Sequence, residues 1–159
     1  MLRGSDLQKI FFILFFTLTI FSTSQAQAEN HDNYLIEITT GSVQGEHEKS
    51  NDYGIEFETF LSGFHHHLAV GLVAEVETPD DDNILYVGPL VSLYYEHFKV
   101  FVSGGWQSHF DHQLMAKLRL GLGYEYELGH HFYLIPSVAQ DWVEQESFMA
   151  TNIGLARTF

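Results

Sequence analysis

Cysteine is absent from the 159-residue chain. No disulfide framework can therefore stabilise the fold, and no thiol is available for nucleophilic or redox chemistry. Stability must come instead from backbone hydrogen bonding and from the medium that surrounds the fold.

Basic residues are also few, with 7 Lys and Arg against 21 Asp and Glu. This acidic excess argues against binding to nucleic acid and against electrostatic docking on anionic lipid. A Gly-rich phosphate loop, a paired-His metalloprotease motif and a basic aromatic platform are all missing from the sequence.

Long apolar runs are limited to one, at residues 10–21. It follows a short basic segment and precedes a small-x-small triplet that ends at Ala28, which is the pattern of a secretory signal peptide over residues 1–28. The run is shorter than the roughly 20 residues that a membrane-spanning helix needs. We expect one mature domain, residues 29–159, and because no later window is apolar enough for a helix, any membrane span must be made of strands.

What the chain does contain is a two-residue alternation of apolar side chains with small or charged ones. In residues 114–128, Leu118 and Leu120 fall on one face of an extended strand, and Lys117 and Arg119 fall on the other. Segments of this kind, separated by short polar breaks, predict an all-β fold. The eight predicted strands are residues 34–43, 53–61, 68–77, 84–95, 99–107, 114–128, 132–143 and 148–159. The fourth is apolar on both faces, so its orientation stays open.

The two faces differ in bulk, and this difference predicts which one points inward. An eight-stranded barrel encloses a space just wide enough for side chains to fill. The face rich in Gly, Ala, Ser and charge fits there, whereas the face of Leu, Val and aromatic residues requires hydrocarbon outside. The prediction is a closed eight-stranded antiparallel up-and-down transmembrane β-barrel. The alternative is a soluble periplasmic β-barrel that buries the apolar face around an apolar ligand.

The segment Gly-Leu-Gly-Tyr-Glu-Tyr-Glu-Leu-Gly at residues 121–129, with the closing strand, resembles the small outer-membrane β-barrel proteins typified by the transmembrane domain of outer membrane protein A. In that family, a terminal aromatic residue and alternating apolar residues form the signal read by the barrel-assembly machinery. Phe159, Leu155 and Ile153 match this pattern, while Arg157 stands where an apolar or aromatic residue is usual. The resemblance implies a monomer in the outer membrane, surrounded by outer-membrane lipid and lipopolysaccharide, with periplasmic termini and the assembly machinery as its partner.

Charged residues on the inward face would meet inside such a barrel. Because unpaired charge is costly in a narrow lumen, we expect Lys117 and Arg119 to sit between carboxylates in a hydrogen-bonded network. The predicted members are Glu37, Glu56, Glu58, Glu75, Lys99, Lys117, Arg119, Glu125, Glu127 and Asp141. The network is either a plug that fills the barrel or a gate or proton-linked pathway. We favour the plug because eight strands leave no open aqueous channel.

Histidine is abundant, at 10 residues, and several histidines cluster in predicted turns. Imidazole clusters bind zinc or copper, and the candidates at the periplasmic rim are His65, His66, His67, His130 and His131. Ligand spacing within turns is nonspecific, so we interpret them as polar turn residues and predict neither a metal nor another cofactor.

A catalytic arrangement is not apparent in the sequence. Barrel hydrolases that deacylate lipid A carry a His-x-Ser pair, and no His of this chain has Ser two residues further on. Nucleophilic catalysis needs a base beside the hydroxyl group. We therefore predict a structural or envelope-associated binding role without catalysis. A barrel enzyme acting on lipid A stays as an alternative, because a lipid-facing set of Ser, His and acid needs no such motif.

Overall fold

The computed structural model describes residues 33–45, 49–61, 67–79, 83–109 and 114–159. The predicted signal peptide, residues 1–28, lies outside the described residues. Within the described ranges there is no helix with the length and apolar character needed to cross a membrane. The strands are β1 (Tyr34–Gln44), β2 (Lys49–Phe60), β3 (Leu68–Thr78), β4 (Ile84–Tyr95), β5 (Phe98–His109), β6 (Leu114–Tyr124), β7 (Tyr126–Gly129), β8 (Phe132–Val143) and β9 (Glu146–Thr158).

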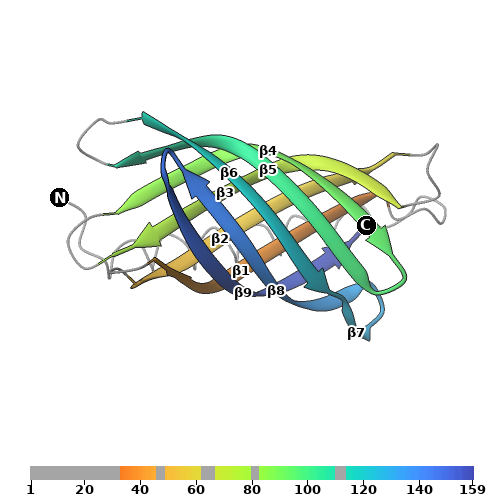
Figure 1. The fold of residues 1–159 in the computed structure, drawn as a ribbon. Helices are drawn as coiled ribbons and strands as arrows, with labels where there is room; N and C mark the ends of the chain where they lie inside the picture. Colours follow the sequence, from red (N-terminus) through yellow and green to blue (C-terminus); the bar gives the residue numbers. More distant parts are fainter. Residues whose placement is uncertain (1–32, 46–48, 62–66, 80–82, 110–113) are drawn as a thin grey trace. The chain divides into compact units, whose positions relative to one another are not determined.

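The strands form one antiparallel sheet in the order β6-β5-β4-β3-β2-β1-β9-β8-β7. Strand β6 also pairs with β8, and this pairing closes the sheet into a barrel (Figure 1). The prediction of an all-β, closed eight-stranded antiparallel barrel is confirmed, with β7 as an additional short strand.

The predicted single strand over residues 114–128 is divided at Glu125 into β6 and β7. Strand β6 has two hydrogen-bonded neighbours, but its pairing with β5 ends at Tyr124. Beyond this point β7 pairs with β8 alone, and its register shifts between Glu127 and Gly129. The division therefore falls where the neighbouring strand β5 ends, so β7 continues β6 past the closed part of the barrel wall.

The faces of β6 are oriented as the alternation predicts. Leu118, Leu120 and Leu122 are 50%, 48% and 46% exposed, whereas Lys117 and Arg119 are buried inside. Since the lumen of eight strands is narrow, small residues open the space that these long cations occupy, and the branched apolar residues lie outside.

Strand β4, which the sequence left unoriented, turns one apolar set inward. Tyr86 and Leu90 are buried in the lumen, while Val87 and Leu93 are exposed on the outer face. The Tyr86 hydroxyl group donates a hydrogen bond to Ser103 Oγ at 2.9 Å. A buried tyrosine needs such a partner for its hydroxyl group, and β5 supplies it.

The first and last hairpins pair closer to their turns than predicted, because β2 begins at Lys49 and β9 begins at Glu146. Strands β1 and β2 pair as far as Gln44 opposite Lys49, so the break predicted at residues 44–52 shrinks and Asp52 lies within β2. Strands β8 and β9 pair to the very turn, which leaves a two-residue connection whose first residue, Glu144, has φ of 54°. Continued pairing satisfies more backbone groups than a long loop would.

The two rims of the barrel carry different connections. The Asn33 N–H group donates to the Phe159 carbonyl oxygen at 2.8 Å, and the Phe159 N–H group donates to the Tyr34 carbonyl oxygen at 2.9 Å. We call this rim the terminal end; it also carries the β2–β3, β4–β5 and β7–β8 connections. The opposite rim, which we call the loop end, carries the β1–β2, β3–β4, β5–β6 and β8–β9 connections.

Apolar side chains share the lumen with the charged ones. A terminal-end cluster contains Leu35, Ile135 and Ala156. A second cluster runs from the middle of the barrel toward the loop end and contains Val43, Leu90, Phe101, Ala139 and Ala150. The charged groups therefore lie among apolar side chains, where ion pairs are screened less than in water.

Candidate functional site: a charged lumen

Lys99 of β5 lies at the centre of a group of carboxylates that we call the Lys99 cluster. Its Nζ atom lies 2.7 Å from Glu37 Oε2, 2.7 Å from Glu56 Oε2 and 2.8 Å from Glu58 Oε1. Glu37 and Glu56 are directly opposite one another on β1 and β2, so the strand register itself brings their like charges together. All four residues are buried. The Tyr94 hydroxyl group adds a hydrogen bond to Glu58 at 2.9 Å.

Arg119 of β6 organises a second group, the Arg119 cluster, nearer the loop end. Its Nε atom donates to Asp141 Oδ1 at 2.6 Å and its Nη2 atom to Asp141 Oδ2 at 2.7 Å. The two residues are paired in the β6–β8 register, which fixes this two-pronged geometry. The guanidinium group also donates to Glu75 of β3 and lies 3.8 Å from Asp52 of β2.

Lys117, two residues before Arg119 on the same face, extends the Arg119 cluster toward the loop end. Its Nζ atom lies 2.5 Å from Glu77 Oε1 and 2.9 Å from Asp141 Oδ2. The same atom lies 4.9 Å from the centre of the Tyr86 ring, a distance at which the ring face attracts a cation. Asn152 Nδ2 donates to Asp52 Oδ2 at 3.2 Å.

The lumen holds more carboxylates than cations. The two clusters contain Glu37, Asp52, Glu56, Glu58, Glu75, Glu77 and Asp141 against Lys99, Lys117 and Arg119, and all are buried. Asp52 Oδ1, Glu58 Oε2 and Glu75 Oε2 are buried and have no hydrogen-bond partner among the described residues. Each cation is therefore shared among several carboxylates, and some carboxylate oxygens have no hydrogen-bond donor beside them in the part of the lumen that the structure describes.

Eight of the ten predicted lumen residues are buried in these two clusters; the other two, Glu125 and Glu127, are not. Glu125 lies partly buried between β6 and β7, and Glu127 is exposed on β7. The prediction places Glu127 in the lumen because of its alternation with Glu125, and the structure corrects it: β7 lies beyond the pairing with β5, so it has no closed lumen to face.

Two residues of the network were missed by the sequence interpretation. Asp52 was assigned to a loop because β2 was predicted to begin at Tyr53. Glu77 lies two residues after Glu75 on the inward face of β3. The same two-residue alternation that identified Glu75 is the signal that would have found Glu77.

The histidine candidates are only partly within the described residues. His65 and His66 lie outside them, so the interpretation of these two histidines as polar turn residues stays a prediction. His67 is exposed, with Nδ1 2.9 Å from the Tyr94 carbonyl oxygen, and His130 and His131 are exposed in the β7–β8 turn. Among the described residues, the group of three side chains whose ligand atoms converge is Glu37, Glu56 and Glu58, whose shared centre is occupied by the Lys99 ammonium group.

The residues that match the family's assembly pattern lie along β9. Ile153 and Leu155 are exposed on the outer face, and Phe159 is partly buried at the terminal end. Arg157 lies between two aromatic rings, with its guanidinium carbon 5.2 Å from the centre of Phe132 and 4.7 Å from that of Phe159. The departure from the pattern thus places a cation against aromatic faces, an arrangement that stabilises it.

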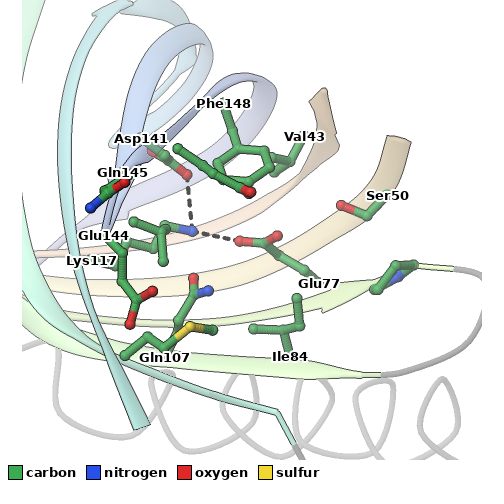
Figure 2. Close-up of a pocket in the computed structure, with 14 residues that line it drawn as sticks. Val43, Ser50, Glu77, Ile84, Gln107, Lys117, Asp141, Glu144, Gln145 and Phe148 are labelled. Atoms are coloured by element: carbon green, nitrogen blue, oxygen red, sulfur yellow. Dashed lines mark hydrogen bonds and ion pairs between the residues drawn. The ribbon is translucent and has the colours of Figure 1, made fainter. Parts of the chain in front are cut away.

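The loop end of the lumen contains a cavity of about 860 Å³. Lys117, Glu77 and Asp141 of the Arg119 cluster form its inner end, and Figure 2 shows the Lys117 ammonium group between the two carboxylates. Val43 and Phe148 also line this space, and Phe148 lies beside Asp141, its partner in the β8–β9 register (Figure 2). Part of the charged network therefore lines a cavity at the loop end.

No protein-family model matches this chain, and no curated protein matches it. Solved structures do. Neisserial surface protein A matches with a TM-score of 0.60 and 11% identity over 82% of this chain and 100% of that one. De novo designed transmembrane β-barrels match with a TM-score of 0.55 and 16% identity over 82% and 98%. The N-terminal β-barrel domain of Pseudomonas aeruginosa OprF matches with a TM-score of 0.52 and 18% identity over 79% and 97%.

These similarities establish the fold. The chain has the architecture of the small outer-membrane β-barrels, and the resemblance drawn from residues 121–129 and Phe159 is confirmed at that level. Identities this low concern the fold alone, so the role of the barrel must be argued from its own residues.

Proposed function

We propose that this chain is a small outer-membrane β-barrel with a plugged polar lumen and a structural or envelope-associated binding role, without catalysis. The observation that carries the proposal is the distribution of side chains. Large apolar residues such as Leu72, Leu93 and Leu118 are exposed on the outer face, while the ion-pair clusters are buried inside.

This distribution is the reverse of what water favours. Soluble monomers rarely expose contiguous apolar patches beyond about 300–600 Å², whereas the outer face of this barrel is apolar on strand after strand. A closed barrel pairs its backbone groups between strands and so suits hydrocarbon. The alternative of a soluble barrel around an apolar ligand is disfavoured, because the interior holds charge where that ligand would lie.

The plug follows from the filling of the lumen. Lys99 and Arg119 each reach across to carboxylates on other strands, and the buried side chains of Phe101 and Leu90 occupy further space in the lumen. In an eight-stranded barrel these side chains fill much of the narrow lumen, and the loop-end cavity is the space they leave. The protein is then a monomer surrounded by outer-membrane lipid and lipopolysaccharide, folded by the barrel-assembly machinery.

Fractionation tests the proposed location. The full-length chain is expressed in a Gram-negative host, and the membranes are separated on a density gradient with a soluble periplasmic protein as the control. We expect the chain in the outer-membrane fraction, with faster gel mobility before heating than after. Recovery in the soluble periplasmic fraction, with mobility insensitive to heating, would contradict the proposal.

Two measurements on the purified barrel test the plug and the absence of catalysis. In a planar bilayer we expect no steady ionic current, with a larger porin as the positive control. On incubation with lipid A we expect no release of fatty acid. A steady current would remove the plug from the proposal, and acyl release would replace the binding role with the lipid A hydrolase.

A further inference from the structure

The cavity at the loop end contains polar side chains that have no hydrogen-bond partner among the residues the structure describes. Gln107 and Ser50 both line it and are 6% and 9% exposed. Within the described part of the chain, neither side chain makes a hydrogen bond, and in Figure 2 both lie at the edge of the same open space. The polar atoms of both side chains stay in contact with the open space of the cavity, so these groups are available to a ligand.

The charge around the cavity is predominantly negative. Glu77 and Asp141 lie at its inner end, and Glu144 and Glu146 are exposed at its rim in and beside the β8–β9 turn. Among the described residues that line the cavity, the one cation is Lys117, and it is already bound to both inner carboxylates. A site with this excess of acid in partly apolar surroundings attracts a cation.

The arrangement of the carboxylates favours an organic cation over a metal ion. A divalent metal needs several oxygen ligands that converge at about 2.0–2.6 Å. Among the described residues, the group of acids whose oxygens lie close enough is Glu37, Glu56 and Glu58 in the Lys99 cluster, and it lines no part of the cavity. The acids of the cavity are spread from its inner end to its rim, which suits a longer, diffuse cation.

The walls supply the second requirement of such a ligand. Val43, Ile84 and Phe148 line the cavity beside the polar groups (Figure 2). Small-molecule sites typically have volumes of about 300–1,000 Å³ and combine apolar walls with a few placed polar groups. The cavity of about 860 Å³ meets both conditions.

We propose that the loop-end cavity binds a small organic cation, in which one or two ammonium groups are carried on a short hydrocarbon chain. The Gln107 side-chain carbonyl oxygen and the Ser50 hydroxyl group each accept a hydrogen bond from an ammonium group, the rim acids Glu144 and Glu146 attract the cation, and the hydrocarbon chain lies along Val43 and Phe148. The inference rests on the proposed binding role and names the ligand class of that role.

Calorimetric titration of the full chain, folded in lipid nanodiscs, tests the ligand class. The probes are cadaverine, pentanediol and glutarate, which share a five-carbon chain and differ in charge; empty nanodiscs provide the blank. We expect saturable heat with cadaverine and none with the diol or the dicarboxylate. Absence of saturable cadaverine binding, or equal binding of glutarate, would overturn the proposal, and saturable calcium binding in place of cadaverine would replace it with a metal site.

Variants locate the binding within the barrel. Gln107→Leu removes the cavity amide, and we expect it to weaken cadaverine binding about tenfold, the effect of one lost hydrogen bond to a charged group. The double variant Glu144→Gln and Glu146→Gln alters only exposed rim residues and should weaken binding about threefold to tenfold. Glu127→Gln removes the same type of charge at the terminal end and is the matched control, expected to leave the affinity unchanged.

The outcomes separate this inference from the function on which it rests. Heat-dependent gel mobility first verifies that each variant is folded. If folded rim variants and Glu127→Gln bind cadaverine as tightly as the unaltered chain, binding is not at the cavity and the inference fails. If the barrel is found in the outer membrane but does not bind cadaverine, the ligand inference is wrong and the proposed location stands. If the chain is found in the soluble fraction, the proposed function is wrong, whatever the chain binds.

Discussion

Arg119 contacts carboxylates on several strands, and only one of these strands is its hydrogen-bonded neighbour in the sheet. It binds both carboxylate oxygens of Asp141 on the neighbouring strand β8 and reaches Glu75 on β3 across the lumen. A buried pair of this kind is not in itself strongly stabilising, since desolvation offsets the attraction. Removal of one partner is different, because the remaining charges stay buried without compensation.

Arg119→Ala is therefore expected to lower barrel stability by about 3–5 kcal/mol, the usual cost of breaking a buried ion pair. The midpoint of thermal unfolding, followed by heat-dependent gel mobility, measures the effect. Lys49→Ala removes an exposed base at the start of β2 and should change stability by less than about 0.5 kcal/mol. An unchanged midpoint for Arg119→Ala would show that the network does not hold the barrel together.

Gly121 illustrates how tightly the lumen is filled. A Cβ atom added there would collide with the ring of Phe101, which is buried on the neighbouring strand β5. A Cβ atom added at Gly104 would meet nothing closer than Leu118 Cδ1 at 3.8 Å. The two glycines therefore differ in the space beside them.

We predict that Gly121→Ala destabilises the barrel by about 1–3 kcal/mol, as overpacking of a filled interior does, while Gly104→Ala has little effect. Urea unfolding midpoints in lipid vesicles provide the comparison. Phe101→Leu in the Gly121→Ala background should recover part of the loss, because the smaller side chain makes room. Equal effects at the two glycines would argue that the lumen is loosely packed.

Which residues point inward was largely predictable, and which residues meet there was not. Two-residue alternation alone assigned Lys99 and Arg119 to the lumen, because adjacent side chains of a strand must alternate between faces. The contact of Lys99 with Glu37 depends on how β5 and β1 are staggered around the closed barrel, and alternation carries no information on that stagger. Asp52 was lost for a different reason: a polar stretch was interpreted as a loop, although pairing with β1 keeps it extended.

At the scale of the element, β6 shows both the strength and the limit of the pattern. Its outward leucines run from Leu114 near the loop end through Leu120 in the middle. The alternation continues into β7, which is why one long strand was predicted. The end of the strand was set by its neighbour β5, whose pairing stops at Tyr124, and a partner's end cannot be found from the pattern of the strand itself.

The cost of an outward-facing charge on β6 is predicted to depend on its depth in the membrane. Leu120→Arg, at mid-strand, is expected to destabilise the barrel in lipid vesicles by about 2–4 kcal/mol, whereas Leu114→Arg, at the strand end, should cost about 0–1 kcal/mol. Both leucines are exposed on the outer face, so they form a matched pair. Urea unfolding midpoints measure the difference. If both substitutions were harmless, the outer face would be in water and the membrane assignment would fail.

At the scale of the whole barrel, the charges are divided between its walls. The three lumen cations come from the adjacent strands β5 and β6, and the carboxylates come from β1, β2, β3 and β8. Ion pairs such as Lys99 with Glu37 therefore connect strands that are not neighbours in the sheet. These ion pairs connect opposite sides of the barrel wall, in addition to the backbone hydrogen bonds between neighbouring strands.

The excess of carboxylates makes the two partners of one ion pair unequal. Lys99→Met leaves Glu37, Glu56 and Glu58 buried together without their shared cation, and we expect a loss of about 3–5 kcal/mol. Glu37→Gln removes the other partner of the same ion pair, yet it relieves repulsion from Glu56, its cross-strand neighbour, so its effect should be below about 1 kcal/mol. Urea unfolding midpoints compare the two variants.

Lowering the pH should restore much of the stability of Lys99→Met. The folded variant then takes up protons that remove the like charges, and stability rises as pH falls when the folded state binds more protons. Equal losses for the two variants, or a Lys99→Met midpoint that does not respond to pH, would mean that the surplus acids do not interact as a group.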